Sequence, residues 1–196
     1  MQILYHDNDL AVIVKPVGLE SESAVPQEIK KLLGGECFTV HRLDQNVGGV
    51  MVYARTKAAA AALSRAVTEG TMVKEYVALV HGETEESGDL EDLLLKDKNK
   101  NKVFVVSRER AGVKYARLTF TRLAVRGDHS LVRIRLYTGR SHQIRVQFAS
   151  RKHPLLGDHK YGARDNLTAP QLFSCCLTFP WKGRTLRFEQ LPEWGI

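Results

Sequence analysis

Apolar residues alternate with polar ones along much of the chain, and this pattern predicts a protein rich in β-strands. It is clearest over residues 130–137, where Val132, Ile134 and Leu136 would face a core while the intervening arginines would face the opposite side. Further apolar runs predict strands over 10–15, 49–55, 74–82, 102–107, 114–125 and 172–179.

Helical patterns are fewer and lie apart from one another. The clearest covers residues 56–70, with Thr56 as a plausible N-cap. A shorter helix is predicted over 26–33, where a proline begins the pattern, and a third over 142–150 with Ser141 as its cap. Many strands with a few separated helices predict an α+β fold, built on a large mixed, mostly antiparallel sheet with flanking helices.

Length and composition predict one globular domain. The chain has 196 residues, of which 43% are hydrophobic and 26% charged, and no apolar run is long enough to span a bilayer. Residues 1–16 read as strand, turn and strand, without the basic start of a signal peptide. Three cysteines are too few for a disulfide framework or a zinc site, so we expect a reduced, cytoplasmic setting.

The charge pattern adds an anionic partner to this picture. The formal net charge is +7, and nucleic acid is the commonest partner of basic proteins. Residues 83–92 hold six acids and no base, which we interpret as a solvated loop. Residues 96–117 hold eight bases and two acids, and more arginines follow. This second block is the expected source of phosphate contacts.

The stretch "HRLDQNVGGV" (41–50) holds the first candidate for chemistry. An isolated aspartate in such a turn-rich segment would ordinarily accept backbone N–H bonds and nothing more. Asp44, however, has His41 and Arg42 beside it, and Gly48-Gly49 allow another element or a ligand to approach closely. Both interpretations of Asp44 are open on this evidence alone.

The second candidate region is residues 137–162. Arg140, His142 and Arg145 gather at a predicted helix start, where backbone N–H groups and guanidiniums favour an anion such as phosphate. The alternative is a helix with a solvated basic edge. The segment "HPLLGDHKYG" (153–162) is rich in turn-forming residues and also carries histidines, charges and a tyrosine around two leucines.

Metal and nucleotide cofactors find little support in the spacing of residues. Several residues are of metal-ligating types: His41, Asp44, His142, His153, Asp158 and His159. No HxxxH, HExxH or CxxC spacing occurs among them, and neither a dinucleotide-binding nor a P-loop fingerprint is present. A serine triad would lack its G-x-S-x-G elbow. We therefore expect neither metal nor cofactor.

Several segments together resemble one family, the RluA-type pseudouridine synthases. The resemblance is carried, in order, by "HRLDQNVGGVMVYART", "KEYVALVHG", "LYTGRSHQIRVQFAS" and "HPLLGDHKYG". The segments "LYHDNDLAVIVKPVGL" and "LFSCCLTFP" are similar to the family's first strand pair and to a late strand. The similarity runs from about residue 3 to 180. It implies an α+β fold with a central active-site cleft and a single catalytic domain over 1–196, without an S4-type RNA-binding domain before it.

The resemblance also implies an activity and roles for individual residues. The family isomerises uridine to pseudouridine in structured RNA such as tRNA or ribosomal RNA, without a cofactor. By motif, Asp44 is the catalytic residue, Tyr76 lies at the target base and helps to remove the C5 proton, and Arg145 pairs with the aspartate. The predicted substrate-binding residues are His41, Arg42, Arg140, His142 and Leu177. We expect a cytoplasmic monomer with no membrane contact.

The sequence departs from the family pattern at three positions. Val47 and Gly48 stand where threonine and serine are usual, and Gln147 replaces a common histidine. The two lost hydroxyls leave a second class of function open: an RNA-binding or RNA-folding protein on the same scaffold, with weak or no isomerase activity. A metal-dependent hydrolase built on the histidines and aspartates is the third.

Overall fold

A computed structural model describes residues 1–194, which form two compact units. The first unit combines residues 1–74 with the segment that begins at Phe173, and the second comprises Glu75–Leu172. The sequence expectation was a single catalytic domain, which stays a prediction. Within the described residues, no helix is long and apolar enough to cross a membrane.

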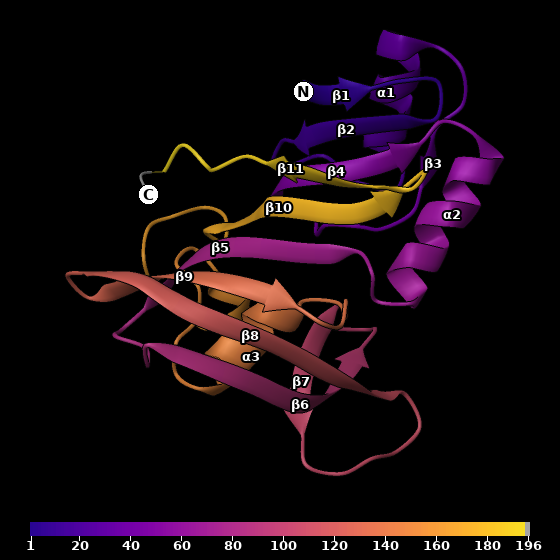
Figure 1. Ribbon diagram of the computed structural model, residues 1–196. Coiled ribbons are helices and arrows are strands. Elements are labelled where there is room, and N and C mark those ends of the chain that lie inside the picture. The colour runs from indigo at the N-terminus through magenta and orange to yellow at the C-terminus, as the bar shows by residue number, and fades with distance from the viewer. Residues whose placement is uncertain (195–196) are drawn as a thin grey trace. The chain divides into compact units, whose positions relative to one another are not determined.

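The first unit is built on strands from both ends of the chain (Figure 1). Its strands run in the order β1-β2-β4-β10, with β3 paired to β4 and β11 paired to β10. Their bounds are β1 Gln2–His6, β2 Leu10–Lys15, β3 Phe38–Thr39, β4 Gly48–Ala54, β10 Leu172–Trp181 and β11 Arg184–Glu189. The pairing of β4 with β10 is parallel, whereas β1, β3 and β11 join their neighbours in antiparallel fashion.

Helix α2 (Lys57–Thr68) packs on this unit with one apolar face. The Oγ1 atom of Thr56 accepts a hydrogen bond from the Ala59 backbone N–H at 3.2 Å, so the predicted N-cap is confirmed. Ala59, Leu63 and Ala66 are buried at spacings of four and three residues, as expected for one side of a helix. They join the core between β2, β4 and β10. Helix α1 (Ala24–Leu33) is shorter and carries Pro26 in its first turn.

The strands of the second unit run in the order β5-β9-β8-β6-β7. The bounds are β5 Val73–His81, β6 Ser87–Asp97, β7 Lys102–Val106, β8 Val113–Arg126 and β9 His129–Leu136. Helix α3 (Gln143–Ser150) lies against β6 and β7 (Figure 1). Phe148 of α3 makes an edge-to-face contact with Phe120 of β8. The short 3₁₀ helix η1 (His159–Tyr161) follows α3.

The predicted α+β class and the mostly antiparallel pairing are confirmed, and each predicted strand and helix is present within two residues of its expected bounds. In β9, Val132 and Ile134 are fully buried, as the alternation predicts. The prediction of Ser141 as a helix cap is wrong: α3 has His142 as its N-cap, with a left-handed φ of 50°. The Gln143 side chain closes this turn instead, since its Oε1 accepts from the Arg140 backbone N–H at 3.0 Å.

The interpretation of residues 83–92 as a solvated loop is also wrong for most of that block. Strand β6 begins at Ser87 and includes its last six residues. Asp89 pairs across the sheet with Arg117, and the distance from Arg117 Nη2 to Asp89 Oδ2 is 2.7 Å. The acids of this block therefore supply countercharges to the neighbouring strand β8.

Candidate active site

Asp44 lies at the start of a tight turn that leads into β4. The Val47 N–H donates to the Asp44 carbonyl oxygen at 3.0 Å, and Gly48 then begins the strand. Leu43 and Val47 on either side are buried, while Asp44 itself is partly exposed. Two buried apolar residues thus anchor the loop on either side of the partly exposed Asp44.

A buried ammonium group fixes this loop from below. Lys15, at the end of β2, is fully buried, and its Nζ donates to the carbonyl oxygens of Pro16, Leu19 and Gln45 at 2.8–3.1 Å. Burial lowers the pKa of Lys15 to about 8, and the negative charge of Asp44 acts in the opposite direction. Lys15 therefore ties the Asp44 loop to the segment after β2 and contributes a positive charge to the carboxylate's surroundings. Sequence analysis did not single out Lys15, although the Lys-Pro pair was visible.

His41 and Arg42 lie in the same loop but make different contacts. The Val52 N–H donates to His41 Nε2 at 3.1 Å, which joins the ring to the backbone of β4. Burial, together with the charge of Lys74, lowers the pKa of His41 to about 3, so the ring is neutral at physiological pH. Arg42 is exposed and pairs with Glu22 at 2.8 Å. The substrate-binding roles of both residues stay predictions.

Leu177 and Tyr76 are both buried side chains on strands. Leu177 lies on β10 in the hydrophobic core of the first unit, together with Phe179 and residues of β4. Tyr76 lies on β5 in the second unit and is 6% exposed. Burial of an apolar strand residue is ordinary packing, so a role of Leu177 at a uracil base stays a prediction, as does the role of Tyr76.

The start of α3 gathers the three basic residues that the sequence placed there. Arg140 Nε donates to the Tyr115 carbonyl oxygen at 2.8 Å, and its side chain is otherwise exposed. The Nδ1 atom of His142 lies 2.9 Å from the Tyr161 hydroxyl. The buried Arg145 guanidinium donates from Nε and Nη2 to the two carboxylate oxygens of Asp158, at 2.7 Å each. The predicted partner of Arg145 was Asp44, and that pairing stays a prediction.

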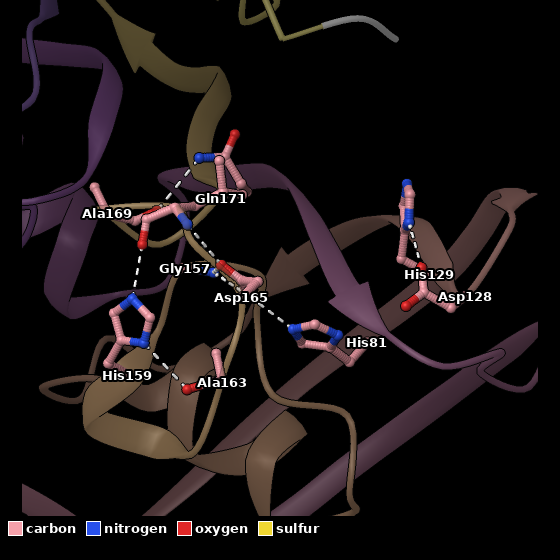
Figure 2. A network of polar contacts seen from close by, with 10 residues as sticks. His81, Asp128, His129, Gly157, His159, Ala163, Asp165, Ala169 and Gln171 are labelled. Carbon is pink, nitrogen blue, oxygen red and sulfur yellow. Dashed lines mark hydrogen bonds and ion pairs between the residues drawn. The ribbon is translucent and has the colours of Figure 1, made fainter.

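The loop after η1 is closed by a polar network (Figure 2). The Asp165 carboxylate accepts from the N–H groups of Gly157 and Leu167 and lies 2.8 Å from His81 Nε2. Partial desolvation alone would raise the pKa of Asp165, but these bonds outweigh it and lower the pKa to about 2. The loop is thereby tied to the end of β5, and Asp165 stays ionised at physiological pH.

His159 closes the same loop with both of its ring nitrogens. Nδ1 lies 3.1 Å from the Ala163 carbonyl oxygen and Nε2 lies 2.7 Å from that of Leu167 (Figure 2). Because a carbonyl oxygen only accepts, both nitrogens must carry hydrogen, which requires the imidazolium form. The bonds to Leu167 and Ala163, with the charges of Asp165 and Asp158, raise the pKa of His159.

The two hydrogen bonds of the His159 imidazolium, which we call the imidazolium clamp, predict a pH-dependent contribution to the stability of the protein. Because the pKa of His159 is raised in the folded protein, the contribution is complete below about pH 6.5, the ordinary histidine value, and is lost as pH rises through the raised value. The stability advantage of the wild type over His159→Gln should therefore shrink as pH rises from about 6.5 into the alkaline range. Urea unfolding of both proteins across this range measures it, since groups common to both cancel. An advantage that stays constant or grows with pH contradicts the imidazolium clamp.

The residues considered for metal binding do not come together in the described structure. Among residues 1–194, no group of three or more His, Cys, Asp or Glu side chains is placed to hold a metal ion. Their side chains have other partners: His153 Nδ1 bonds to the His81 carbonyl oxygen, and Asp158 binds Arg145. This donor set does not fit a metal centre, and a metal-dependent hydrolase gains no support from it.

Two departures from the family pattern have visible packing reasons. A Cβ atom at Gly48 would lie 3.2 Å from the Lys15 carbonyl oxygen and 3.4 Å from the Phe173 ring, so the space for a larger residue is tight. Gln147, in the position of the common histidine, donates to the Leu90 carbonyl oxygen and to Asp92. It holds α3 against β6, which is a structural task.

Several arginines expected at phosphates already have acidic partners. Besides Arg117, Arg122 pairs with Glu83 at 2.8 Å and Arg133 with Glu75 at 2.7 Å. Phosphate groups would have to compete with these carboxylates. The exposed Arg135 and Arg140 are thus better placed for phosphate contacts than the paired arginines.

The α+β fold presents an aspartate on a loop that a buried lysine fixes, and an arginine on a separate helix. A protein with these features has clear relatives. The sequence profile of the family described as RNA pseudouridylate synthase matches residues 9–150. The chain is 35% identical to ribosomal large subunit pseudouridine synthase D of Vibrio cholerae over 177 residues, which are 84% of this chain and 53% of that protein. It is 33% identical to the dual-specificity RNA pseudouridine synthase RluA of Yersinia pestis, over 96% of this chain and 98% of that protein.

The structural comparison agrees. The solved structure of human RNA pseudouridylate synthase domain containing 4 superposes with a TM-score of 0.83 and 26% identity, covering 98% of this chain and 89% of that one. The chain belongs to the RNA pseudouridylate synthase family, of the RluA type. It spans about half the length of several curated relatives that it matches, such as the Vibrio cholerae protein.

Proposed function

We propose that this protein is an RNA pseudouridine synthase that isomerises uridine in structured RNA, with Asp44 as its catalytic residue. The observation that carries the proposal is the Asp44 loop itself. In a chain of this family, the aspartate of the matching motif stands partly exposed at a turn that Lys15 and buried neighbours hold in place.

The reaction requires such a carboxylate. The bond from uracil N1 to C1′ breaks, the base rotates, and a new bond forms from C5 to C1′. The proton on C5 is released to water, and N1 gains a proton. An ionised Asp44 would assist the first step, by attacking C1′ or by helping a glycal to form. Lys15 places a positive charge near this carboxylate, and the two opposite charges attract each other.

The remaining residues take the roles that the family motif implies. Tyr76 would contact the target base and help to remove the C5 proton, and Arg145 would pair with Asp44. His41, Arg42, Arg140, His142 and Leu177 would bind the flipped nucleotide and its flanking phosphates. In this proposal the two units serve together as one catalytic domain, and the protein works as a cytoplasmic monomer without metal or cofactor.

The names of the relatives support an RNA substrate. One relative is named for the large ribosomal subunit and another for dual specificity towards RNA. We therefore propose ribosomal or transfer RNA as the substrate class. The target nucleotide must leave its stack to reach the aspartate, as in other enzymes that act on a base.

Tritium release tests the proposal directly. RNA labelled with tritium at uracil C5 is incubated with the protein, and the expected result is release of tritium to water, with equal amounts of pseudouridine in the digested RNA. Release should be the same with and without EDTA. Binding of RNA without release would favour the RNA-binding alternative, and loss of activity in EDTA would favour a metal-dependent enzyme.

A further inference from the structure

The segment "HPLLGDHKYG" has no part in the reaction as proposed, yet two of its side chains enclose Arg145. Asp158 is 1% exposed, and its carboxylate accepts both Nε and Nη2 of the guanidinium at 2.7 Å. Such a two-point contact fixes the plane of the group and its rotation about the last side-chain bond. It engages two of the five N–H groups of an arginine, so the others can serve other acceptors.

Tyr161 provides the second support. Its ring lies beside the guanidinium, with 5.1 Å between Arg145 Cζ and the ring centroid. The ring is itself fixed, since its hydroxyl accepts from the Val103 N–H at 2.8 Å and lies 2.9 Å from His142 Nδ1. It therefore joins β7, the start of α3 and Arg145.

Backbone hydrogen bonds join Asp158 and Tyr161 in one compact turn. The Tyr161 and Ala163 N–H groups both donate to the Asp158 carbonyl oxygen, at 3.0 and 3.1 Å. The Asp158 N–H in turn donates to the Leu155 carbonyl oxygen at 3.1 Å, and Leu155 is fully buried. The carboxylate and the ring are thus held at a fixed spacing, which is the condition for orienting a third group between them.

We propose that Asp158 and Tyr161 are positioning residues, which hold the Arg145 guanidinium in the orientation that the isomerisation requires. This inference rests on the proposed function. A flat, directional cation stabilises a charged group only from one orientation, and small errors in placement lower the rate of a chemical step more than they lower binding. Both residues lie after the segment that the family's sequence profile matches, which ends at residue 150.

The chain offers a matched control for Asp158. Asp92 also accepts an arginine of the α3 region, since Arg151 Nη1 lies 2.8 Å from its Oδ2, and it also bonds to Gln147. Asp92→Asn and Asp158→Asn therefore both weaken an ion pair that anchors α3 to its surroundings. Of these two aspartates, only Asp158 contacts Arg145. Substitution of Asp158, but not of Asp92, should therefore change the rate of the chemical step.

The experiment measures kcat and KM for tritium release at a temperature where each variant is fully folded by circular dichroism. Asp158→Asn should lower kcat by about 100-fold and leave KM within about threefold, whereas Asp92→Asn should keep kcat within about threefold of the wild type. Tyr161→Leu should lower kcat by about tenfold, and Tyr161→Phe, which keeps the ring beside Arg145, should restore most of it. The Tyr161 pair decides the question if Asp158→Asn does not fold.

The contrary outcomes separate this inference from the proposed function. A wild-type protein that releases no tritium refutes the function and this inference with it. If the wild type is active, three results would each refute the positioning role while leaving the proposed function in place. Asp158→Asn and Asp92→Asn could lower kcat equally, or Asp158→Asn could change only KM. In the third case, Tyr161→Leu and Tyr161→Phe would have the same activity.

Discussion

Replacing Asp44 with asparagine is expected to abolish pseudouridine formation, with a loss of rate on the order of 10⁴-fold or more. Asparagine has nearly the same shape, and the turn from Asp44 to Val47 depends on a backbone carbonyl that the substitution keeps. Only the negative charge and the nucleophilic oxygen disappear. Tritium release from labelled RNA measures the loss, and thermal unfolding verifies that the variant is folded.

Asp7→Asn is the matched control for Asp44→Asn. Asp7 is an ordinary turn aspartate whose Oδ1 accepts from the N–H groups of Asp9 and Leu10, at 2.8 and 2.7 Å. Asparagine can accept the same bonds, so Asp7→Asn should keep its activity within about threefold. If Asp44 were only a turn residue, the two variants would behave alike. An Asp44→Asn protein that keeps more than about one hundredth of the wild-type rate contradicts the proposed mechanism.

Gly49→Ala is expected to destabilise the first unit by about 4 kcal/mol, a large part of the ~5–15 kcal/mol that stabilises most domains. Gly49 has a φ of +127°, which costs an alanine about 1–2 kcal/mol. Its new Cβ would also meet the backbone of Ser174 on the parallel strand β10, with the Ser174 nitrogen only 2.5 Å away. Relieving this overlap costs about 1–3 kcal/mol more. Urea unfolding gives the difference.

Gly70→Ala separates these two causes. Gly70 also has a positive φ, of +71°, but a Cβ there would meet nothing within 4 Å. Its substitution should therefore cost only the backbone strain, about 1 kcal/mol. Equal losses of stability in both variants would show that β10 can move away from Gly49, and would contradict the tight contact between these strands.

The spacing of apolar residues was enough to predict strands in which they alternate with polar residues and helices in which they recur every three to four residues. It failed at β6 because Asp92 occupies a position between the buried Leu90 and Leu94, where the pattern calls for an apolar residue. Gln147 of α3 and Arg151, directly after α3, bond to that carboxylate, and the arginine also neutralises it. Both partners are distant in sequence. A strand whose polar residue is satisfied by another element cannot be recognised from its own alternation.

The residues of the candidate site likewise fall into those that the sequence predicted and those that it did not. Asp44, Tyr76 and Arg145 were named because motifs carry them, and the part of the chain with the family match includes all three. Lys15 and Asp158 were missed as contributors because their importance comes from contacts: a buried ammonium beneath a loop and a carboxylate around a guanidinium. Neither residue type nor spacing reveals such contacts, since they join segments that meet only in the fold. The Ser141 prediction failed for a local reason: His142 is the N-cap, and the Gln143 side chain closes the turn at the Arg140 N–H.

The first unit is discontinuous in the chain, and this has a consequence for the order in which it can be made. Its core needs Leu177 and Phe179, and the strand that presents Asp44 pairs with β10 through Gly48 and Gly49. On a ribosome these partners emerge only after the whole of residues 75–172. The Asp44 loop therefore gains its final support only after β10 has been synthesised. Chains released before β10 would carry Asp44, Tyr76 and Arg145, yet lack the strand on which the catalytic loop rests.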